Sequence, residues 1–211
     1  MANKGILTVV SGFSGAGKGT LMKRLMSDYD NYALSISMTT RAPREGERDG
    51  IEYFFTTKEK FEEAIANDGL IEYAQYVGNY YGTPRAYVES QLEAGKDVIL
   101  EIEIQGALKV KAQYPDCLLL FVTPPSAKEL EKRLVGRGTE TPEVIAKRLA
   151  RAVEESQGIE DYDYVVVNDD LDECVKQLHS LVQNEHFKIS QKKDFIEEIR
   201  EELKEFSKGA K

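Results

Sequence analysis

Short apolar runs alternate with amphipathic stretches along most of the chain, and this alternation predicts a layered α/β fold. Runs typical of strands lie at residues 6–10, 32–38, 53–55, 70–76, 98–104, 118–122 and 164–167. Apolar residues at helical spacing predict helices over residues 21–28, 58–67, 84–94, 105–113, 127–135, 142–155 and from residue 171 onward. Strands that alternate with helices imply right-handed crossovers and a parallel sheet covered by helices on both faces.

The stretch from residue 39 to 95 interrupts this pattern with a small α/β pattern of its own. It predicts an insertion into a core formed by residues 1–38 and 96–211. Within the insertion, the glycine- and tyrosine-rich residues 78–82 predict a loop. Thr83 is a good helix N-cap and Pro84 a good first helical residue, so a helix is expected to begin there.

The C-terminal region contains neither glycine nor proline from Val175 until Gly209. Its apolar residues fall near a spacing of three and four, interrupted by Glu185 and Lys192. Two interpretations stay open. One is a long helix that packs back on the domain, and the other is a helix that mediates a homodimer.

The stretch ILTVVSGFSGAGKGTL, residues 6–21, contains the G-x-x-x-x-G-K phosphate-loop motif between an apolar strand and a helix. Glycines let backbone N–H groups approach phosphate oxygens, and the helix N-terminus adds donors and a positive dipole end. Lys18 is expected to reach the β- and γ-phosphates of a nucleotide. Gly19 stands where Ser or Thr usually binds Mg²⁺, so Thr20 is the candidate metal-side hydroxyl, and the ion is expected to be held mostly through water and phosphate.

Composition narrows the possible partners. The 211 residues carry a net charge of −9, which argues against a general nucleic-acid or membrane-surface binder. No apolar run approaches the roughly 20 residues of a membrane span, and no signal peptide is visible. Cys117 and Cys174 lack metal or redox spacing and are expected to be reduced thiols in a cytoplasmic protein.

A basic loop follows the predicted second strand. Arg41 and Arg44, with Arg48 as a further candidate, can bind phosphate oxygens bidentately, and Tyr53 and Tyr81 can add neutral donors. A solvated charged loop is the simpler interpretation. The phosphate interpretation is favoured because ligands of such sheets bind at the carboxyl ends of strands.

Acidic residues stand within apolar surroundings at Glu72, Glu101 and Glu103. Glu101 and Glu103 are two apart in a predicted strand and are therefore expected to point to the same side. Each could be a paired structural acid. A carboxylate can also accept both N1–H and the 2-amino group of guanine, an arrangement that adenine does not offer.

A second basic group comprises Arg133, Arg137, Arg148 and Arg151. Arg137 lies between two glycines, as expected of a mobile arginine that neutralises charge on a transferring phosphoryl group. Surface charge with partners four residues away is the alternative, and it is the preferred interpretation for Arg151 and Lys147.

Seven segments resemble, in order along the chain, the motifs of guanylate kinases over roughly residues 5–185. They are SGFSGAGKGT, SMTTRAPREGE, YFF, LIEYAQYVGNYYGTP, ILEIEIQGA, RLVGRGTET and VVVNDDL. The resemblance implies a P-loop NTPase-type three-layer α/β fold with a central parallel sheet, a GMP-binding insertion at 39–95 and a helical lid at about 136–150. It implies the transfer of phosphate from ATP to GMP with Mg²⁺ in purine nucleotide metabolism.

The resemblance also implies roles for individual residues. The implied ATP-binding residues are Gly12, Phe13, Ser14, Gly15, Ala16, Gly17, Lys18, Gly19, Thr20, Asn168 and Asp169. The implied GMP-binding residues are Ser37, Arg41, Arg44, Glu47, Tyr53, Glu72, Tyr81, Thr83, Glu101 and Glu103. Lys18, Arg133, Arg137 and Arg148 match the catalytic positions, and Thr20 is the candidate metal contact.

Two positions depart from the family pattern. GKGT at the phosphate loop resembles adenylate kinases, and Glu103 stands where many guanylate kinases carry Asp. Two alternatives therefore accompany the expected activity: another monophosphate kinase, and a guanylate-kinase-like scaffold that binds phosphopeptides without catalysis. The intact lysine loop argues against the scaffold.

Overall fold

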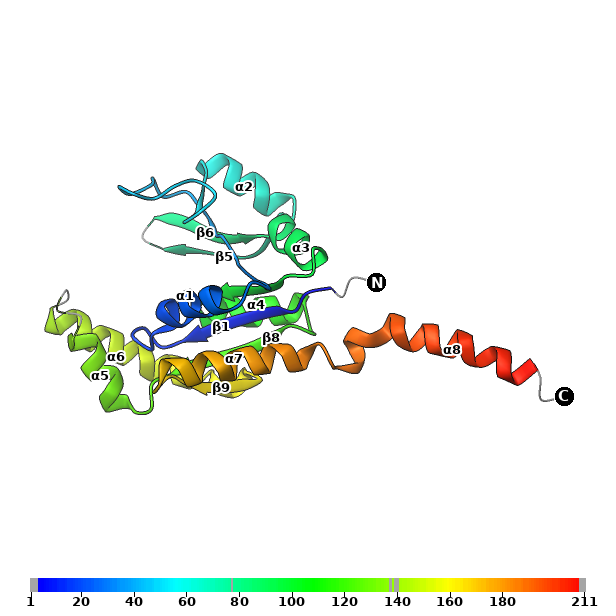
Figure 1. Ribbon diagram of the computed structural model, residues 1–211. Coiled ribbons are helices and arrows are strands. Elements are labelled where there is room, and N and C mark those ends of the chain that lie inside the picture. Colours follow the sequence, from blue (N-terminus) through cyan, green and yellow to red (C-terminus); the bar gives the residue numbers. More distant parts are fainter. Residues whose placement is uncertain (1–3, 77, 137, 139–140, 209–211) are drawn as a thin grey trace.

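The computed structural model describes residues 4–76, 78–136, 138 and 141–208. Its centre is a five-stranded parallel sheet with strand order β2-β7-β1-β8-β9 (Figure 1). The strands are β1 (Leu7–Gly12), β2 (Tyr32–Leu34), β7 (Asp97–Glu101), β8 (Leu118–Thr123) and β9 (Tyr164–Val167). The predicted parallel α/β sheet is confirmed.

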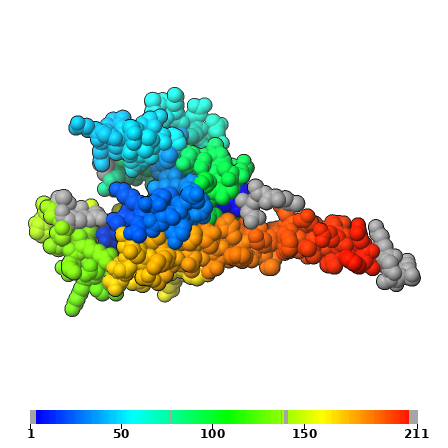
Figure 2. Space-filling model, viewed as in Figure 1, coloured from blue at the N-terminus to red at the C-terminus, as the bar shows by residue number. Residues whose placement is uncertain are grey.

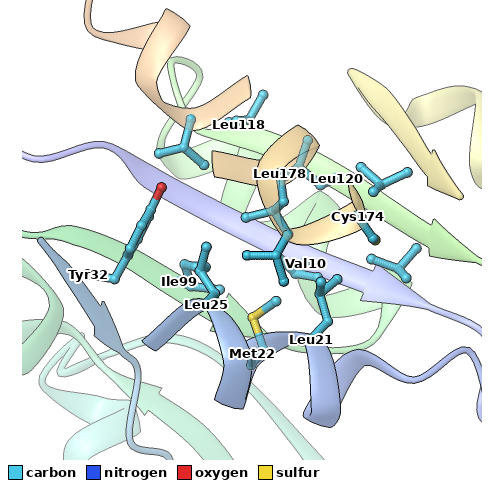
Figure 3. Packing of buried hydrophobic residues seen from close by; sticks show 14 of the residues in the cluster. Val10, Leu21, Met22, Leu25, Tyr32, Ile99, Leu118, Leu120, Cys174 and Leu178 are labelled. Carbon is cyan, nitrogen blue, oxygen red and sulfur yellow. The ribbon is translucent and has the colours of Figure 1, made fainter. Parts of the chain in front are cut away.

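Helices cover both faces of this sheet because successive strand residues point to opposite sides. On one face, α1 (Lys18–Asp28) and α7 (Leu171–Glu185) pack on Val10, Ile99 and Leu120 (Figure 3). On the other face, α3 (Arg85–Glu93) and α4 (Ile104–Gln113) pack on Val9 and Leu100. Burying each such side chain stabilises the fold by about 1.5–3 kcal/mol before entropic costs.

A second, four-stranded sheet has the order β4-β3-β6-β5 and lies over the α3–α4 side of the main sheet (Figure 1). Its strands are β3 (Met38–Thr39), β4 (Phe54–Phe55), β5 (Leu70–Tyr76) and β6 (Asn79–Pro84). Helix α2 (Lys58–Ala66) is capped by the Thr57 hydroxyl, and its buried Phe61 stacks on Tyr80. Ile71 joins the main core, which fixes this sheet to the rest of the molecule.

A helical pair stands beside the phosphate-loop end of the main sheet (Figure 1). It consists of α5 (Ala127–Gly136) and α6 (Pro142–Ser156), and the short helix η1 (Ile159–Asp161) follows. Ser126 caps the start of α5, since its hydroxyl accepts from Glu129 N at 3.1 Å. Leu130, Leu134 and Ala152 form the small core of the pair.

The single strand predicted over residues 32–38 is wrong. Strand β2 pairs with β7 from Tyr32 to Leu34 and no further along the run. The next residue, Ser35, donates its N–H to Ile99 O. After residues 35–37 the chain enters the second sheet as β3, which pairs with β4 and β6. The alternating pattern continues across this crossing, so the sequence does not reveal that the hydrogen-bonding partners change.

The predicted loop at residues 78–82 and the Thr83 cap are also wrong. Residues 79–84 form strand β6, which pairs antiparallel with β5 and β3. Helix α3 begins one residue after Pro84, which has no side-chain cap role. Thr83 is buried and its hydroxyl donates to a carboxylate, which makes it part of the site rather than of a helix start.

The strand predicted over residues 98–104 ends earlier, at Glu101. Glu103 is the N-cap residue of α4, so Glu101 and Glu103 do not share a strand face as expected. The Ser11 hydroxyl donates to Ile102 O at 2.7 Å, which occupies this carbonyl just where the strand stops.

Both interpretations of the C-terminal region assume one long helix, but the chain bends after α7. The turn η2 (Ile189–Lys192) leads into α8 (Lys193–Lys208), which projects from the body (Figures 1 and 2). Helix α7 packs on the core through Cys174, Val175, Leu178 and Val182. Helix α8 does not pack on the domain, so the interpretation of one long helix that packs back on the domain is wrong for this part of the chain. No described helix has the length and apolar character needed to cross a bilayer.

Asp97 fixes the end of α7 to the start of the main sheet. Its buried carboxylate accepts from Ile6 N at 2.9 Å, from Asn31 Nδ2 at 2.9 Å and from Gln183 Nε2 at 3.0 Å. His186 Nε2 lies 2.8 Å from its Oδ1. These bonds satisfy a charge that would be costly to bury alone.

Candidate nucleotide-binding site

The phosphate loop, residues 12–18, connects β1 to α1 at the carboxyl edge of the main sheet. Gly17 is the N-cap of α1 with φ 91°, a left-handed conformation that favours glycine. A Cβ atom on Gly17 would lie 2.5 Å from Asn168 Nδ2, so the close packing of this loop also requires glycine. The predicted order of strand, glycine loop and helix is confirmed, and a helix N-terminus at this place favours an anion.

Asn168 holds this loop in place. Its side chain, only 7% exposed, donates from Nδ2 to Ala16 O at 2.8 Å. Asn168 follows β9 directly, whereas Asp169 beside it is exposed. The resemblance places both residues beside the ATP adenine. The structure assigns Asn168 a contact with the loop backbone, which the sequence did not reveal.

Lys18 folds over the same loop. Its Nζ donates to Gly12 O at 2.6 Å and to Phe13 O at 3.2 Å. The ammonium group thus lies at the mouth of the loop, where bound phosphates would meet it. Gly19 and Thr20 follow in the first turn of α1 and are exposed.

A cavity of about 550 Å³ opens in front of the loop. Three parts of the chain line it: the phosphate loop with residues 101–104, the four-stranded sheet (the small sheet) through Tyr76, and α6. A neighbouring cavity of about 380 Å³ is lined by Lys18, Thr20, Lys23 and Glu101. Ser14, Lys18 and Glu101 line both cavities, so the two cavities adjoin at the phosphate loop.

Glu101 lines both cavities beside Lys18. Partial burial raises the pKa of its carboxyl, and the nearby Lys18 ammonium opposes this rise. The sequence groups Glu101 with the guanine-reading acids. In the structure it lies at the phosphate loop, because β7 ends at this residue beside β1.

Glu72 and Thr83 form the polar centre of the small-sheet side. The Thr83 hydroxyl donates to Glu72 Oε1 at 2.7 Å, and the two residues lie on the paired strands β5 and β6. Burial raises the pKa of the Glu72 carboxyl, and nearby Glu103 raises it further, whereas the Thr83 bond and Lys109 lower it. A Cβ atom on Gly106 would lie 3.2 Å from Glu72 Oε2, so glycine leaves room for this carboxylate. Ser37, which immediately precedes β3, lies in the chain crossing between the two sheets.

Glu103 forms an ion pair with Arg151, which the sequence analysis interpreted as a surface residue. Arg151 on α6 donates from Nη2 to Glu103 Oε2 at 2.7 Å and from Nε to Glu155 Oε1 at 2.9 Å. The expected partner of Arg151 four residues away is thus confirmed, and it is Glu155. The second bond joins Arg151 to Glu103, and both of these residues line the cavity. This pair joins the helical pair to the acidic side of the cleft.

The basic loop of the small sheet is arranged around Glu47. Arg41 Nη2 donates to Glu47 Oε1 at 2.8 Å, and Arg44 N donates to Oε2 at 2.7 Å. These bonds, with that of Arg41 first, lower the pKa of the Glu47 carboxyl. Tyr53 lies beneath the Arg41 guanidinium at 5.2 Å, and its ring contacts that of Tyr81. The structure therefore brings Arg41, Glu47, Tyr53 and Tyr81 together as predicted, while the Arg44 side chain is exposed.

The predicted catalytic arginines separate in the structure. Arg148 lines the large cavity and its Nη1 donates to the Ser14 hydroxyl of the phosphate loop. Arg133 instead pairs with Glu129 on its own helix, Nε to Oε1 at 3.0 Å. Arg137 lies outside the described residues, as does part of the predicted lid.

Metal ligands are sparse among the described residues, which contain no cluster of three His, Cys, Asp or Glu side chains able to hold an ion. Thr20 and Glu101 supply a hydroxyl and a carboxylate to the cavity beside Lys18. Oxygen donors of this kind suit Mg²⁺ that keeps several waters and is held mainly by substrate phosphates.

Tyr76, Lys147 and Arg151 also line the large cavity, and the sequence did not identify them as site residues. Lys147 and Arg151 lie on the same helix as Arg148, at spacings of one and three residues. Their place on one amphipathic helix with Arg148 is the only signal that the sequence offers for them.

A phosphate loop at the carboxyl edge of a parallel sheet covered by helices on both faces, with a lysine that lines two adjoining cavities, defines a P-loop nucleotide-binding protein. A family model described as "Guanylate kinase" matches residues 4–185. The chain is 48% identical to a guanylate kinase of Latilactobacillus sakei over 190 residues, which cover 90% of this chain and 94% of the relative. It is 52% identical to one of Streptococcus thermophilus, with 90% and 91% covered.

A solved structure supports the same assignment. The crystal structure of guanylate kinase from Anaplasma phagocytophilum superimposes with a TM-score of 0.70 and 32% identity, covering 90% of each chain. The chain belongs to the guanylate kinase family. The expectation drawn from the sequence motifs is therefore confirmed at the level of family and fold.

Proposed function

We propose that this chain transfers the γ-phosphoryl group of ATP to GMP and releases ADP and GDP. As a guanylate kinase it is an ATP:GMP phosphotransferase, with roles in purine nucleotide metabolism and GMP recycling. The observation that carries the proposal is the common cleft. Lys18 and the phosphate loop form one wall, and Glu103, at the edge of the Glu72–Thr83 site, forms another.

ATP phosphates bind along residues 12–20, where loop N–H groups and Lys18 neutralise their charge. A GMP phosphate oxygen attacks the γ-phosphorus in line, and the bond from that phosphorus to the ADP oxygen breaks. The hydrogen bond from Arg148 to Ser14 of the loop supports a role for this arginine in neutralising charge on the transferred phosphoryl group. Arg137 is proposed as its partner by motif alone, and Arg133 is assigned a supporting role because it is paired with Glu129.

GMP binds between the small sheet and the core. Arg41, Arg44, Tyr53 and Tyr81 hold its phosphate, and Glu47 orients Arg41. The guanine ring lies against Ser37, Glu72, Thr83 and Glu103. The ionised Glu72 accepts from guanine N–H groups with the oxygen that Thr83 leaves open. Adenine presents no matching pair of donors, so it leaves a half-buried carboxylate unsatisfied.

Mg²⁺ accompanies ATP, and Thr20 and Glu101 are the protein groups that would hold it. When bound, the ion neutralises phosphate charge and helps to orient the γ-phosphoryl group. Residues 39–95 form the GMP-binding insertion, and the segment at about 136–150 forms the lid. Closure of both over the cleft excludes water and prevents ATP hydrolysis. The proposed location is the cytoplasm.

The test is a coupled assay of ADP release with ATP-Mg²⁺ and, in turn, GMP, AMP, CMP and UMP. We expect turnover with GMP alone, and a loss on the order of 10³-fold in Lys18→Ala with an unchanged circular dichroism spectrum. Lys176→Ala, an exposed lysine on α7 that lines neither cavity, is the matched control. Turnover with AMP would favour the adenylate-type alternative raised by GKGT. If none of the four nucleotides supported ADP release, the phosphopeptide-scaffold alternative would be favoured. The next test would then be phosphopeptide binding at Arg41 and Arg44.

A further inference from the structure

Helix α8 carries an apolar stripe that the rest of the described chain leaves uncovered. The stripe consists of Phe195, Ile196, Ile199, Leu203 and Phe206. Phe195, Ile199, Leu203 and Phe206 are 59%, 39%, 58% and 77% exposed. At helical spacing all five lie within an arc of about 100°, so they form one continuous strip. Figures 1 and 2 show this helix projecting beyond the main body.

We propose that the α8 stripe binds the same stripe of a second copy, in a parallel two-stranded coiled coil that makes the chain a homodimer. Ile196, Ile199, Leu203 and Phe206 follow one another at spacings of three, four and three residues. This is the repeat that places alternate apolar residues in the seam of two helices. A self-complementary strip fits a two-fold axis, in which each copy offers the same residues.

Charge along the helix selects the partner and its direction. Basic residues follow one edge of the stripe, and acidic residues follow the other. The basic edge is Lys193, Arg200 and Lys204, and the acidic edge is Glu198, Glu202 and Glu205. In a parallel pair, the acidic edge of one helix faces the basic edge of the other, which is attractive. An antiparallel pair would place like edges together. The ion pairs of Arg200 with Glu197 and of Lys204 with Glu201 lie within their own exposed helix and are weak enough to rearrange.

The exposed area is of the size that a dimer needs. Phe187 and Ile189, just before the helix, are each 75% exposed and extend the apolar surface toward the body. Aromatic side chains bury about 150–250 Å² each, so these residues and the stripe expose on the order of 600 Å² per chain. Complete burial of all these side chains in two copies would remove about 1,200 Å² from solvent, which is the lower limit of specific interfaces.

The first test is sedimentation equilibrium of the full chain at micromolar concentration. We expect about 48 kDa, twice the 23.8 kDa of one chain. Leu203→Glu should shift the protein to the monomer, with an at least tenfold weaker dimer, while Glu201→Ala on the opposite face should not. A monomeric parent protein would overturn the proposal, as would a Leu203→Glu variant that dimerises as well as the parent.

A second test fixes the helix direction. A parallel in-register pair brings the two copies of residue 203 together, so Leu203→Cys should oxidise readily to a disulfide-linked dimer. The two native thiols are buried and free, and their pKa values are raised to about 11 by burial, so they do not interfere. Crosslinking only when Ile196→Cys is mixed with Phe206→Cys would show an antiparallel pair and overturn the parallel arrangement.

Discussion

The contact between Asn168 and the phosphate loop leads to a prediction that separates a structural role from nucleotide contact. Asn168→Ala removes the donor to Ala16 O while leaving that carbonyl buried. An unsatisfied buried acceptor costs about 1–3 kcal/mol. For a chain of this length, each kcal/mol lowers the melting temperature by about 2–4 °C. We therefore expect a loss of about 2–12 °C in melting temperature, measured without nucleotide.

The same change should also weaken ATP binding, because the loop loses the contact that holds its backbone in the phosphate-binding conformation. We expect KM for ATP to rise while KM for GMP stays within about twofold, as distant sites are usually independent. Asp169→Ala, at the neighbouring exposed residue, is the control and should leave the melting temperature unchanged. An Asn168→Ala protein that raises KM for ATP at full thermal stability would refute the contact-based reasoning and favour a direct contact with adenine.

Three further predictions concern other contacts. The pKa of Glu72 is raised, and its ionised form is the one that binds guanine. KM for GMP should therefore rise as pH falls, and the rise should begin at a higher pH than for an ordinary glutamate. Glu72→Gln should lose both this pH dependence and the preference for GMP over AMP. Arg151→Ala should raise KM for GMP by up to about fivefold at unchanged kcat, since an exposed pair contributes at most about 1 kcal/mol, and an equal effect in Arg24→Ala would contradict it. Asp97→Ala should lower the free energy of urea unfolding by about 3–5 kcal/mol; a loss below 1 kcal/mol would show that its bonds contribute little.

Local pattern was sufficient for most of the main sheet. The strands at 118–123 and 164–167 and the helices at 127–136 and 142–156 match their predicted positions closely. Each is an apolar run or an amphipathic stretch, and such signals act over a few residues. The phosphate loop belongs to the same class, because a strand, glycines, a lysine and a helix follow one another directly.

The small sheet was less predictable because its strands are short and pair across long sequence separations. Strand β3 has two residues, and nothing in the run from 32 to 38 indicates that the first half bonds to β7 and the second to β6. Thr83 has the local signature of a helix cap, yet pairing with β5 keeps it in a strand and turns its hydroxyl toward Glu72.

The sequence by itself determined the family, the phosphate loop and the residue types that bind nucleotide, since these depend on neighbouring residues and on motifs. Only the tertiary structure decided which of those residues meet. In the folded chain Glu101 lies beside Lys18, and Arg151 forms an ion pair with Glu103. Arg133 pairs with Glu129 on its own helix rather than lining the cleft. The tertiary structure also left the apolar face of α8 exposed. These contacts depend on where distant segments come together in space, and a pattern confined to one segment carries no record of that.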